Sequence, residues 1–174
     1  MNSFKVAPVR RPAYVITVIC FLCGCLLLFS PLFGVQRYLS IIQCVAVGFW
    51  IVAVLVTNRY LLTNYLYEIE VDPNPLSELP KLNIYASRGH NFGHQFYCIP
   101  LEKAYSIEKM HKKEKQPFRT VNSCGSMYPP MLYLVKYDCD GSVNGVWIEC
   151  GKAFADEVGT LIGRYGLKDE KESS

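Results

Sequence analysis

Residues with chemically reactive side chains are few in this sequence, and their spacing matches no metal site. His90 and His94 lie four residues apart, which suits a shared metal ion only on a helix, whereas Gly89 and Gly93 favour a turn. Two histidines also supply fewer ligands than the four that a structural zinc ion takes. We therefore expect no metal site and no cofactor.

The cysteines form no redox or zinc motif either. Cys20, Cys23 and Cys25 lie inside an uncharged run, where a metal ligand would have to be deprotonated away from water. A reaction of Cys124 as nucleophile with His111 as base is the enzymatic alternative, and no motif spacing supports it. In a reducing compartment the later cysteines are most simply small buried residues; they are Cys98, Cys124, Cys139 and Cys150.

The short motifs of common enzyme classes are also missing from the sequence. It contains no G-x-x-x-x-G-K-[ST] phosphate loop, no G-x-S-x-G nucleophile turn and no H-E-x-x-H metal pair. We therefore predict a protein that is not an enzyme.

Basic side chains gather in the segment 88–119. This segment has seven basic and three acidic residues, while the other residues after Thr57 include seven basic and twelve acidic ones. Basic residues beside an anionic membrane surface each gain up to about 1 kcal/mol, whereas a solvated loop of mixed charge is the alternative. Aromatic residues do not alternate with these lysines as they do in nucleic-acid sites. We expect contact with a protein partner or anionic lipid, and no nucleic acid, at Arg88, Lys103, Lys109, Lys112, Lys113, Lys115 and Arg119.

The elements that would position these residues divide at Thr57. Two runs of 20 residues contain no charge, Tyr14–Phe33 and Tyr38–Thr57, and only 34–37 separate them. At 1.5 Å per residue each run would span about 30 Å as a helix, the thickness of a bilayer core. A cleaved signal peptide has a shorter apolar run of about 7–15 residues, and buried helices of a soluble protein have a polar stripe. We therefore predict a transmembrane helical hairpin in the lipid bilayer.

Basic residues near these two runs predict the orientation of the hairpin. Three of them precede the first run, one lies between the runs, and Arg59 follows the second run. Because basic residues are retained on the cytoplasmic side, we expect both termini and the segment 1–13 in the cytoplasm. The sequence thus predicts a multi-pass protein of the cell membrane with two spans.

Small residues recur at every fourth position in both runs. They are Cys20 and Gly24 in the first run, and Ser40, Cys44 and Gly48 in the second. This spacing lets helix backbones approach closely. It indicates packing within the hairpin or, as the alternative, a homo-oligomer formed through Ser40, Cys44 and Gly48.

Residues 58–167 have a size that suits one cytoplasmic domain. Alternating apolar and polar residues predict strands at 60–71, 82–87 and 95–100, and again at 131–138 and 146–150 around a turn. The turn residues between 82–87 and 95–100 predict that these two strands pair as a hairpin, while 101–110 fits either a strand or a short helix. An apolar stripe at helical spacing predicts a helix over 152–165, formed by Phe154, Val158, Leu161, Ile162 and Tyr165. The charged residues 168–174 are expected to be a disordered tail. Several antiparallel strands followed by one helix indicate an α+β fold.

A resemblance to a known family rests on four stretches of the chain, 59–71 directly after the apolar runs, 96–109, 121–141 and 146–162. In their pattern of apolar residues and turns, these stretches resemble the small membrane-anchored proteins of Firmicutes that carry a bacterial pleckstrin-homology-like (PH-like) domain. The resemblance implies a seven-stranded, strongly bent antiparallel sheet capped by one C-terminal helix. It supplies a fold and no activity.

Taken together, these patterns predict a membrane α-helical hairpin joined to an α+β domain that has no catalytic residues. We expect a non-enzymatic, membrane-anchored interaction module that presents its cytoplasmic PH-like domain to a protein partner. Contact of the basic segment with anionic lipid headgroups is the first alternative, and an unrecognised enzyme is the second.

Overall fold

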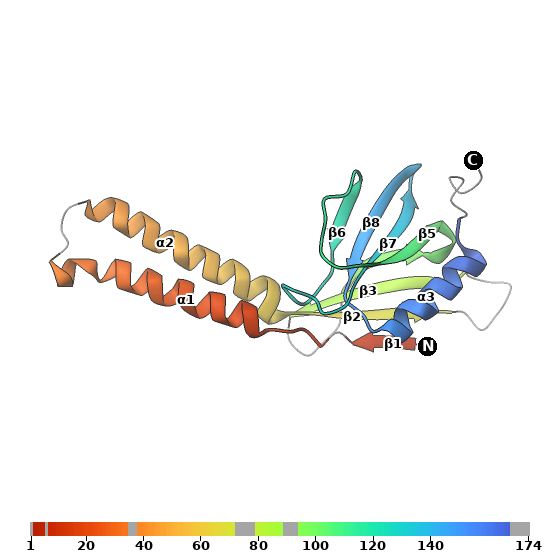
Figure 1. Cartoon of the computed structure of the whole chain (residues 1–174), viewed down its shortest axis with the longest axis horizontal. Helices are drawn as coiled ribbons and strands as arrows, with labels where there is room; N and C mark the ends of the chain where they lie inside the picture. Colours follow the sequence, from red (N-terminus) through yellow and green to blue (C-terminus); the bar gives the residue numbers. More distant parts are fainter. Residues whose placement is uncertain (1, 6, 35–37, 72–78, 89–93, 168–174) are drawn as a thin grey trace. The chain divides into compact units, whose positions relative to one another are not determined.

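The computed structural model describes residues 2–5, 7–34, 38–71, 79–88 and 94–167. The chain divides into a helical unit, Val9–Thr63 with Ser126–Tyr128, and an α+β unit, Met1–Pro8 with Asn64–Gly125 and Pro129–Ser174 (Figure 1). The predicted tail 168–174 lies outside the described residues, as do Arg37 and the predicted turn residues 89–93.

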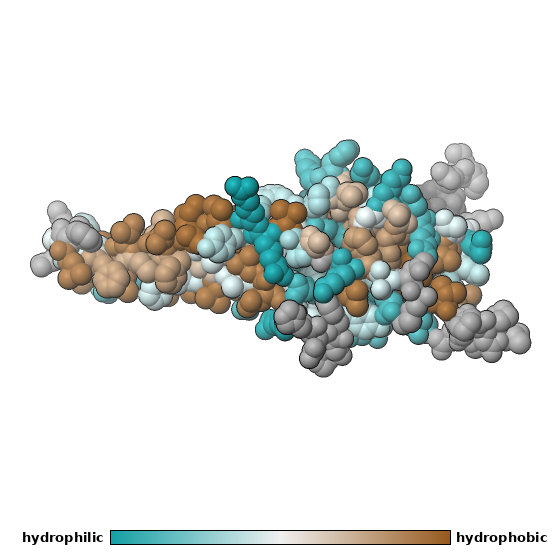
Figure 2. All heavy atoms as spheres, turned by 90° about the horizontal axis from the view of Figure 1, so that it is seen from below, coloured by the Kyte–Doolittle hydropathy of each residue, from teal (hydrophilic) through white to brown (hydrophobic). Residues whose placement is uncertain are grey.

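Two long helices form the helical unit. Helix α1 (Arg11–Leu28) is followed by a short 3-10 helix (Ser30–Phe33), and helix α2 (Leu39–Val56) continues as one π-helical turn (Thr57–Leu62). Both helices are long and apolar enough to span a membrane by their length and composition. Figure 2 shows their extensive apolar surface, and exposed apolar surface of that size is typical of segments that meet a membrane or another protein.

Helix α1 is displaced from the predicted span 14–33. It begins three residues earlier, at Arg11, because Pro12 fits the first turn of a helix, where its missing N–H is not needed. It ends at Leu28, before Pro31, which cannot continue an α-helix. The second predicted span, 38–57, coincides more closely with α2.

Packing between α1 and α2 depends on one of the predicted small residues. A Cβ atom added to Gly24 would overlap the indole ring of Trp50, so only glycine fits there. The ring of Phe21 also stacks on Trp50, with centroids 6.2 Å apart. In contrast, the small-residue row of the second run, Ser40, Cys44 and Gly48, is exposed, and a Cβ atom on Gly48 would meet no atom within 4 Å. The prediction that this row packs within the hairpin is therefore wrong.

The N-terminal residues form a strand that the sequence analysis missed. Strand β1 (Asn2–Lys5) pairs antiparallel with β2 (Thr63–Glu70), with Phe4 opposite Tyr67 and Lys5 opposite Leu66. The segment 1–13 is thus not merely a flank of the first helix. Along the chain, both helices come after β1 and before β2, and these two strands are neighbours in one sheet.

The strands of the α+β unit form two sheets where the sequence predicted one antiparallel sheet. The first has the order β1-β2-β3-β4, with β3 (Lys81–Arg88) and β4 (His94–Pro100), and it confirms the predicted pairing of 82–87 with 95–100. The second has the order β5-β7-β8-β6, formed by β5 (Ala104–Met110), β7 (Leu132–Cys139), β8 (Ser142–Ile148) and β6 (Arg119–Asn122). Strand β6 was not predicted, and it runs parallel to β8.

A short 3-10 helix separates the two sheets in sequence. It comprises Leu101–Lys103, directly after β4, and Leu101 donates its backbone N–H to the Pro80 oxygen at 2.9 Å. The ambiguous stretch 101–110 is therefore this turn followed by β5. Because the turn ends the ladder of β4, the chain enters a second sheet instead of extending the first.

The hairpin of β7 and β8 is tighter than predicted. Only Asp140 and Gly141 separate the paired residues Cys139 and Ser142, and both have positive φ angles of 55° and 79°. Positive φ at two central residues is typical of the type I′ turn, whose twist matches that of the strands. Strand β8 consequently starts at Ser142, four residues before the predicted Val146.

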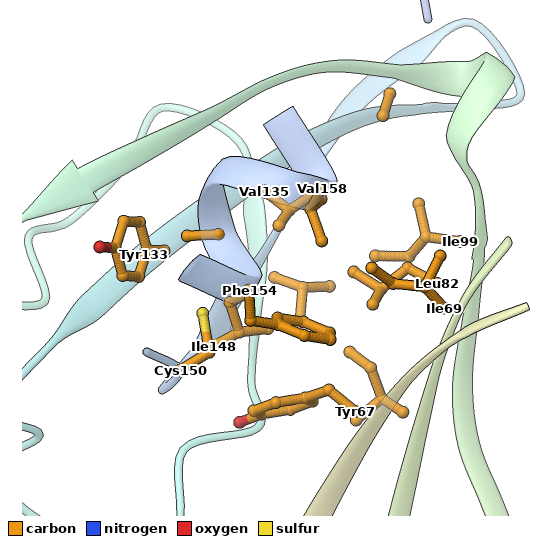
Figure 3. Close-up of a cluster of buried hydrophobic side chains, with 14 of the residues drawn as sticks. Tyr67, Ile69, Leu82, Ile99, Tyr133, Val135, Ile148, Cys150, Phe154 and Val158 are labelled. Carbon is orange, nitrogen blue, oxygen red and sulfur yellow. The ribbon is translucent and has the colours of Figure 1, made fainter. Parts of the chain in front are cut away.

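Helix α3 (Lys152–Tyr165) packs its apolar stripe on both sheets (Figure 3). Phe154, Val158 and Ile162 of the predicted stripe are buried and Leu161 packs against the same core, whereas Tyr165 is exposed. Residues of β2, β3, β4, β7 and β8 complete this core, among them Tyr67, Ile69, Leu82, Ile99, Val135 and Ile148. One core therefore joins the two sheets and the helix, which confirms the α+β class with its C-terminal helix.

Candidate functional site

A groove of about 780 Å³ lies in the α+β unit between α3 and the strands β5 and β7. Strand alternation places Ile107 and Lys109 on the same face of β5, and Tyr133 of β7 pairs with Lys109. We call this site, with the residues of α3 named below, the β5–α3 groove.

Helix α3 contributes one polar row to the groove. Lys152, Asp156 and Thr160 follow one another at four-residue spacing, which places them on one helix face. Gly159 lets this face approach the sheet, because a Cβ atom there would already lie 3.3 Å from Ile107 Cγ2. The groove therefore combines an apolar floor with a polar wall.

The charge of the groove is positive. Lys109 and Lys152 are exposed, and neither makes an ion pair with any of the residues that the structure describes. Asp156 is the acidic residue that lines the same groove. Burial, followed by the charges of Cys150 and Asp156, raises the pKa of Tyr133 and keeps its hydroxyl protonated. The groove thus offers two cationic groups, one carboxylate and neutral polar groups, and its net positive charge suits an anionic ligand.

Of the seven basic residues predicted as contacts, Lys109 lines this groove and the others lie elsewhere. Ala104, Tyr137, Asn144 and Arg119 are successive partners across the second sheet, so Arg119 lies at the same end of that sheet as the start of β5. Lys109 lies near the other end of β5. A strand rises about 3.3 Å per residue, so the two ends of β5 are about 20 Å apart. The predicted set is therefore distributed over both ends of the sheet.

The remaining basic residues lie in turns and at strand ends. Lys103 is exposed in the 3-10 helix, and Arg88 is exposed at the end of β3. In the segment between β5 and β6, Lys112 and Lys115 are exposed and Lys113 is half-buried. Lys112 lies 3.8 Å from Glu114 in a solvated ion pair, and such exposed pairs contribute little to stability.

Residues of the enzymatic alternative show no arrangement that favours catalysis. Cys124 is fully buried, and its backbone N–H donates to Asn122 Oδ1 at 3.1 Å, whereas His111 is exposed. Burial raises the pKa of Cys150 to about 12, with smaller contributions from the charges of Cys124 and Glu149. A buried thiol of this kind is protonated near neutral pH and is a poor nucleophile. The prediction that the four later cysteines are all buried is wrong for Cys98 and Cys139, which are exposed.

Lys152, Tyr133 and Asp156 are the groove residues that sequence reasoning missed. Lys152 and Asp156 carry a detectable signal, because four-residue spacing at the start of a predicted helix places them on one face. Their proximity to Lys109 has no such signal, since it depends on the packing of α3 on β5. In the described residues no three His, Cys, Asp or Glu side chains come together as a metal site.

No family model, curated protein or solved structure matches the chain. The resemblance to bacterial PH-like proteins therefore stays a prediction. The α+β unit contains a cationic groove, and the same chain also forms two strongly apolar helices.

Proposed function

We propose that this chain is a non-enzymatic interaction module, held in the cell membrane by α1 and α2, that presents a cytoplasmic PH-like domain to a protein partner. The observation that carries the proposal is the insertion of both helices between β1 and β2. Because these strands are neighbours in one sheet, both flanks of the helical pair must return to the same side of a bilayer. An even number of spans satisfies that requirement.

The flanking charges support the cytoplasmic side. Arg10 and Arg11 precede or begin α1 and are exposed, and Arg59 lies in the last turn after α2. Basic residues next to a span favour its cytoplasmic end. Arg59 also lies over the ring of Tyr60, with 5.9 Å from its Cζ to the ring centroid, a pairing that suits the membrane interface, where aromatic rings are enriched.

The architecture of the α+β unit supports the PH-like part of the proposal. Two four-stranded sheets share one core, and the C-terminal helix closes it. The family resemblance implied one seven-stranded antiparallel sheet with a capping helix, and the feature shared with it is the single C-terminal helix on a core of mainly antiparallel strands. Such a fold leaves surfaces available for binding, and the β5–α3 groove has exposed lysines on two separate elements.

Cross-linking in intact native membranes tests the proposal. The tagged full-length chain is cross-linked, captured and analysed by mass spectrometry, beside an unrelated two-span protein with the same tag. We expect one partner protein in stoichiometric amount that the control does not capture. Capture of the chain alone, or of the same proteins as the control, would show that the protein-partner proposal is wrong.

A second candidate function is contact with anionic lipid through the exposed lysines between β5 and β6. The observation that favours it is the exposure of Lys112 and Lys115 in one short segment. Hydrogen exchange of residues 111–118 can be compared in nanodiscs of neutral and of anionic lipid. Slower exchange in anionic nanodiscs, lost at high salt, would support lipid contact, whereas equal exchange would remove this candidate.

A further inference from the structure

The β5–α3 groove is lined by two lysines and one acidic residue, Asp156, and neither lysine makes an ion pair with a described residue. Lys109 comes from a strand and Lys152 from the first turn of a helix, so the tertiary fold brings them to one site. Like charges at one site repel each other, and an anionic ligand would relieve that repulsion. The groove therefore has the electrostatic character of a binding site for carboxylates or phosphates.

The apolar residues on the floor of the groove favour a peptide ligand over a free phosphate. Ile107 and Met131 line the floor, and Met131 is 39% exposed although it is apolar. A free phosphate would contact the lysines and leave this apolar surface in water. A peptide segment can cover both, because an apolar side chain between acidic ones removes the floor from water while the carboxylates meet the lysines.

We propose that the β5–α3 groove binds an acidic segment of the protein partner, with carboxylates against Lys109 and Lys152 and an apolar side chain over Ile107 and Met131. This inference rests on the proposed function, because it names the surface and the chemistry by which the partner is recognised. The volume of about 780 Å³ accommodates several side chains, as ligand sites of about 300–1,000 Å³ do.

A labelled peptide tests the inference on the full chain in nanodiscs of neutral lipid. The probe is a fluorescein-labelled peptide with four glutamates around one leucine, and fluorescence anisotropy measures its binding. Matched peptides replace the glutamates by glutamines or by lysines, or the leucine by serine. We expect the acidic leucine peptide to bind more tightly than the other three and to weaken as salt is added.

Charge reversal in the groove supplies the decisive comparison. The double variant Lys109→Glu with Lys152→Glu is expected to bind the acidic peptide at least about tenfold more weakly, which corresponds to a loss of about 1.4 kcal/mol in binding free energy. Lys115→Glu is the matched control, because this lysine is exposed and does not line the groove. The double variant should in turn bind the lysine peptide more tightly than the original chain does, a gain that misfolding cannot produce.

Several results would overturn the inference. The first is that the acidic leucine peptide does not bind, and the second is that Lys115→Glu weakens its binding as much as the double variant does. The third is that the serine peptide binds as tightly as the leucine peptide. The fourth is that inorganic phosphate binds as tightly as the acidic leucine peptide. Cross-linking separates this inference from the proposed function. If the double variant still captures a partner as efficiently as the original chain, the groove assignment fails and the interaction module stands. If the original chain captures no partner, the proposed function itself fails.

Discussion

The hydroxyl of Tyr67 donates a hydrogen bond of 2.9 Å to the backbone oxygen of Ser123, and both residues are buried. The same hydroxyl accepts a bond of 3.1 Å from the backbone N–H of Glu149. Tyr67 belongs to the first sheet, whereas Ser123 follows β6 and Glu149 follows β8 of the second. One side chain thus joins the two sheets by satisfying buried backbone groups.

Replacing Tyr67 by phenylalanine should destabilise the α+β unit by about 1–3 kcal/mol, because a buried carbonyl and a buried N–H each lose their partner. Thermal unfolding of the full chain in detergent measures the change. Tyr128→Phe is the matched control, since Tyr128 is 69% exposed and should change the unfolding temperature little. Equal effects of the two substitutions would show that the Tyr67 hydroxyl does not join the sheets.

A second prediction concerns one glycine in each long helix, Gly24 in α1 and Gly48 in α2. Gly24→Ala should weaken the packing of α1 on α2 by about 1–3 kcal/mol, because the new methyl group would overlap Trp50. Gly48→Ala should leave this packing unchanged, because a Cβ atom there meets open space. Thermal stability in detergent distinguishes the variants. A larger loss with Gly48→Ala would contradict the packing of the two helices.

A third prediction concerns a homo-oligomer, because the row of Ser40, Cys44 and Gly48 is exposed and free to meet a second copy of the chain. If a second copy packs on Ser40, Cys44 and Gly48, the larger substitution Gly48→Leu should reduce the yield of cross-linked dimer in membranes. Small residues at such positions permit close approach of helices, and a leucine prevents it. An unchanged dimer yield, or the absence of dimers from the original chain, would contradict this prediction.

The sequence predicted the elements whose signals are local. The apolar runs, the pairing of 82–87 with 95–100 and the apolar stripe of α3 each depend on neighbours within a few turns or residues. Strand β1 could not be predicted in the same way, because four residues carry little pattern and their partner strand begins at Thr63, beyond both helices. Its pairing depends on tertiary packing.

The candidate site could also be predicted only in part, because its residues come together through tertiary packing. Lys109 was predicted within a long basic segment, yet its neighbours in space are on α3 and β7 instead of in that segment. Lys152 lies 43 positions along the chain, and only the packing of the helix on the sheet brings it to the groove. Charge counting along a sequence therefore detects basic residues without showing which of them share a site.

The ion pair of Glu108 with Lys136 predicts a pH dependence of stability. The hydrogen bond from Lys136 lowers the pKa of Glu108 below its ordinary value of 4.5. Burial is the next largest influence and opposes this lowering, while the hydrogen bond from Ser106 adds to it. A lowered pKa in the folded state stabilises the fold above the unfolded value, and this contribution is lost as the pH falls through the folded pKa.

Unfolding measured at neutral pH and near pH 3 tests this dependence. Glu108→Gln should lose less stability on acidification than the original chain, because it lacks the titrating carboxylate. Glu114→Gln is the control, since its partner Lys112 is 3.8 Å away in an exposed pair. If Glu108→Gln and the original chain respond equally to acid, the ion pair contributes nothing measurable to stability.

Cysteine reactivity tests the enzymatic alternative. The pKa of Cys150 is raised to about 12, so almost none of its thiol is ionised at neutral pH, and Cys124 is fully buried. Alkylation by iodoacetamide, followed by peptide mass spectrometry, should therefore modify both residues only after unfolding, whereas the exposed Cys139 should react in the folded chain. Rapid labelling of Cys124 in the folded protein would contradict its burial and support the enzyme hypothesis.

The last prediction concerns β1, on which the membrane topology argument depends. The ring of Phe4 lies 5.6 Å from that of Phe154, and its edge is close to Gly151, so this N-terminal residue packs on the helix that closes the core. Phe4→Ala should therefore destabilise the α+β unit by about 2–4 kcal/mol, toward the lower value because Phe4 is only partly buried. Val143→Ala, an exposed apolar position in β8, is the control and should have little effect. Thermal unfolding in detergent measures both variants.

If Phe4→Ala unfolds at the same temperature as the original chain, β1 does not hold the N-terminus to the sheet. The pairing of β1 with β2 would then no longer require both flanks of the helical pair to lie on the same side of a bilayer.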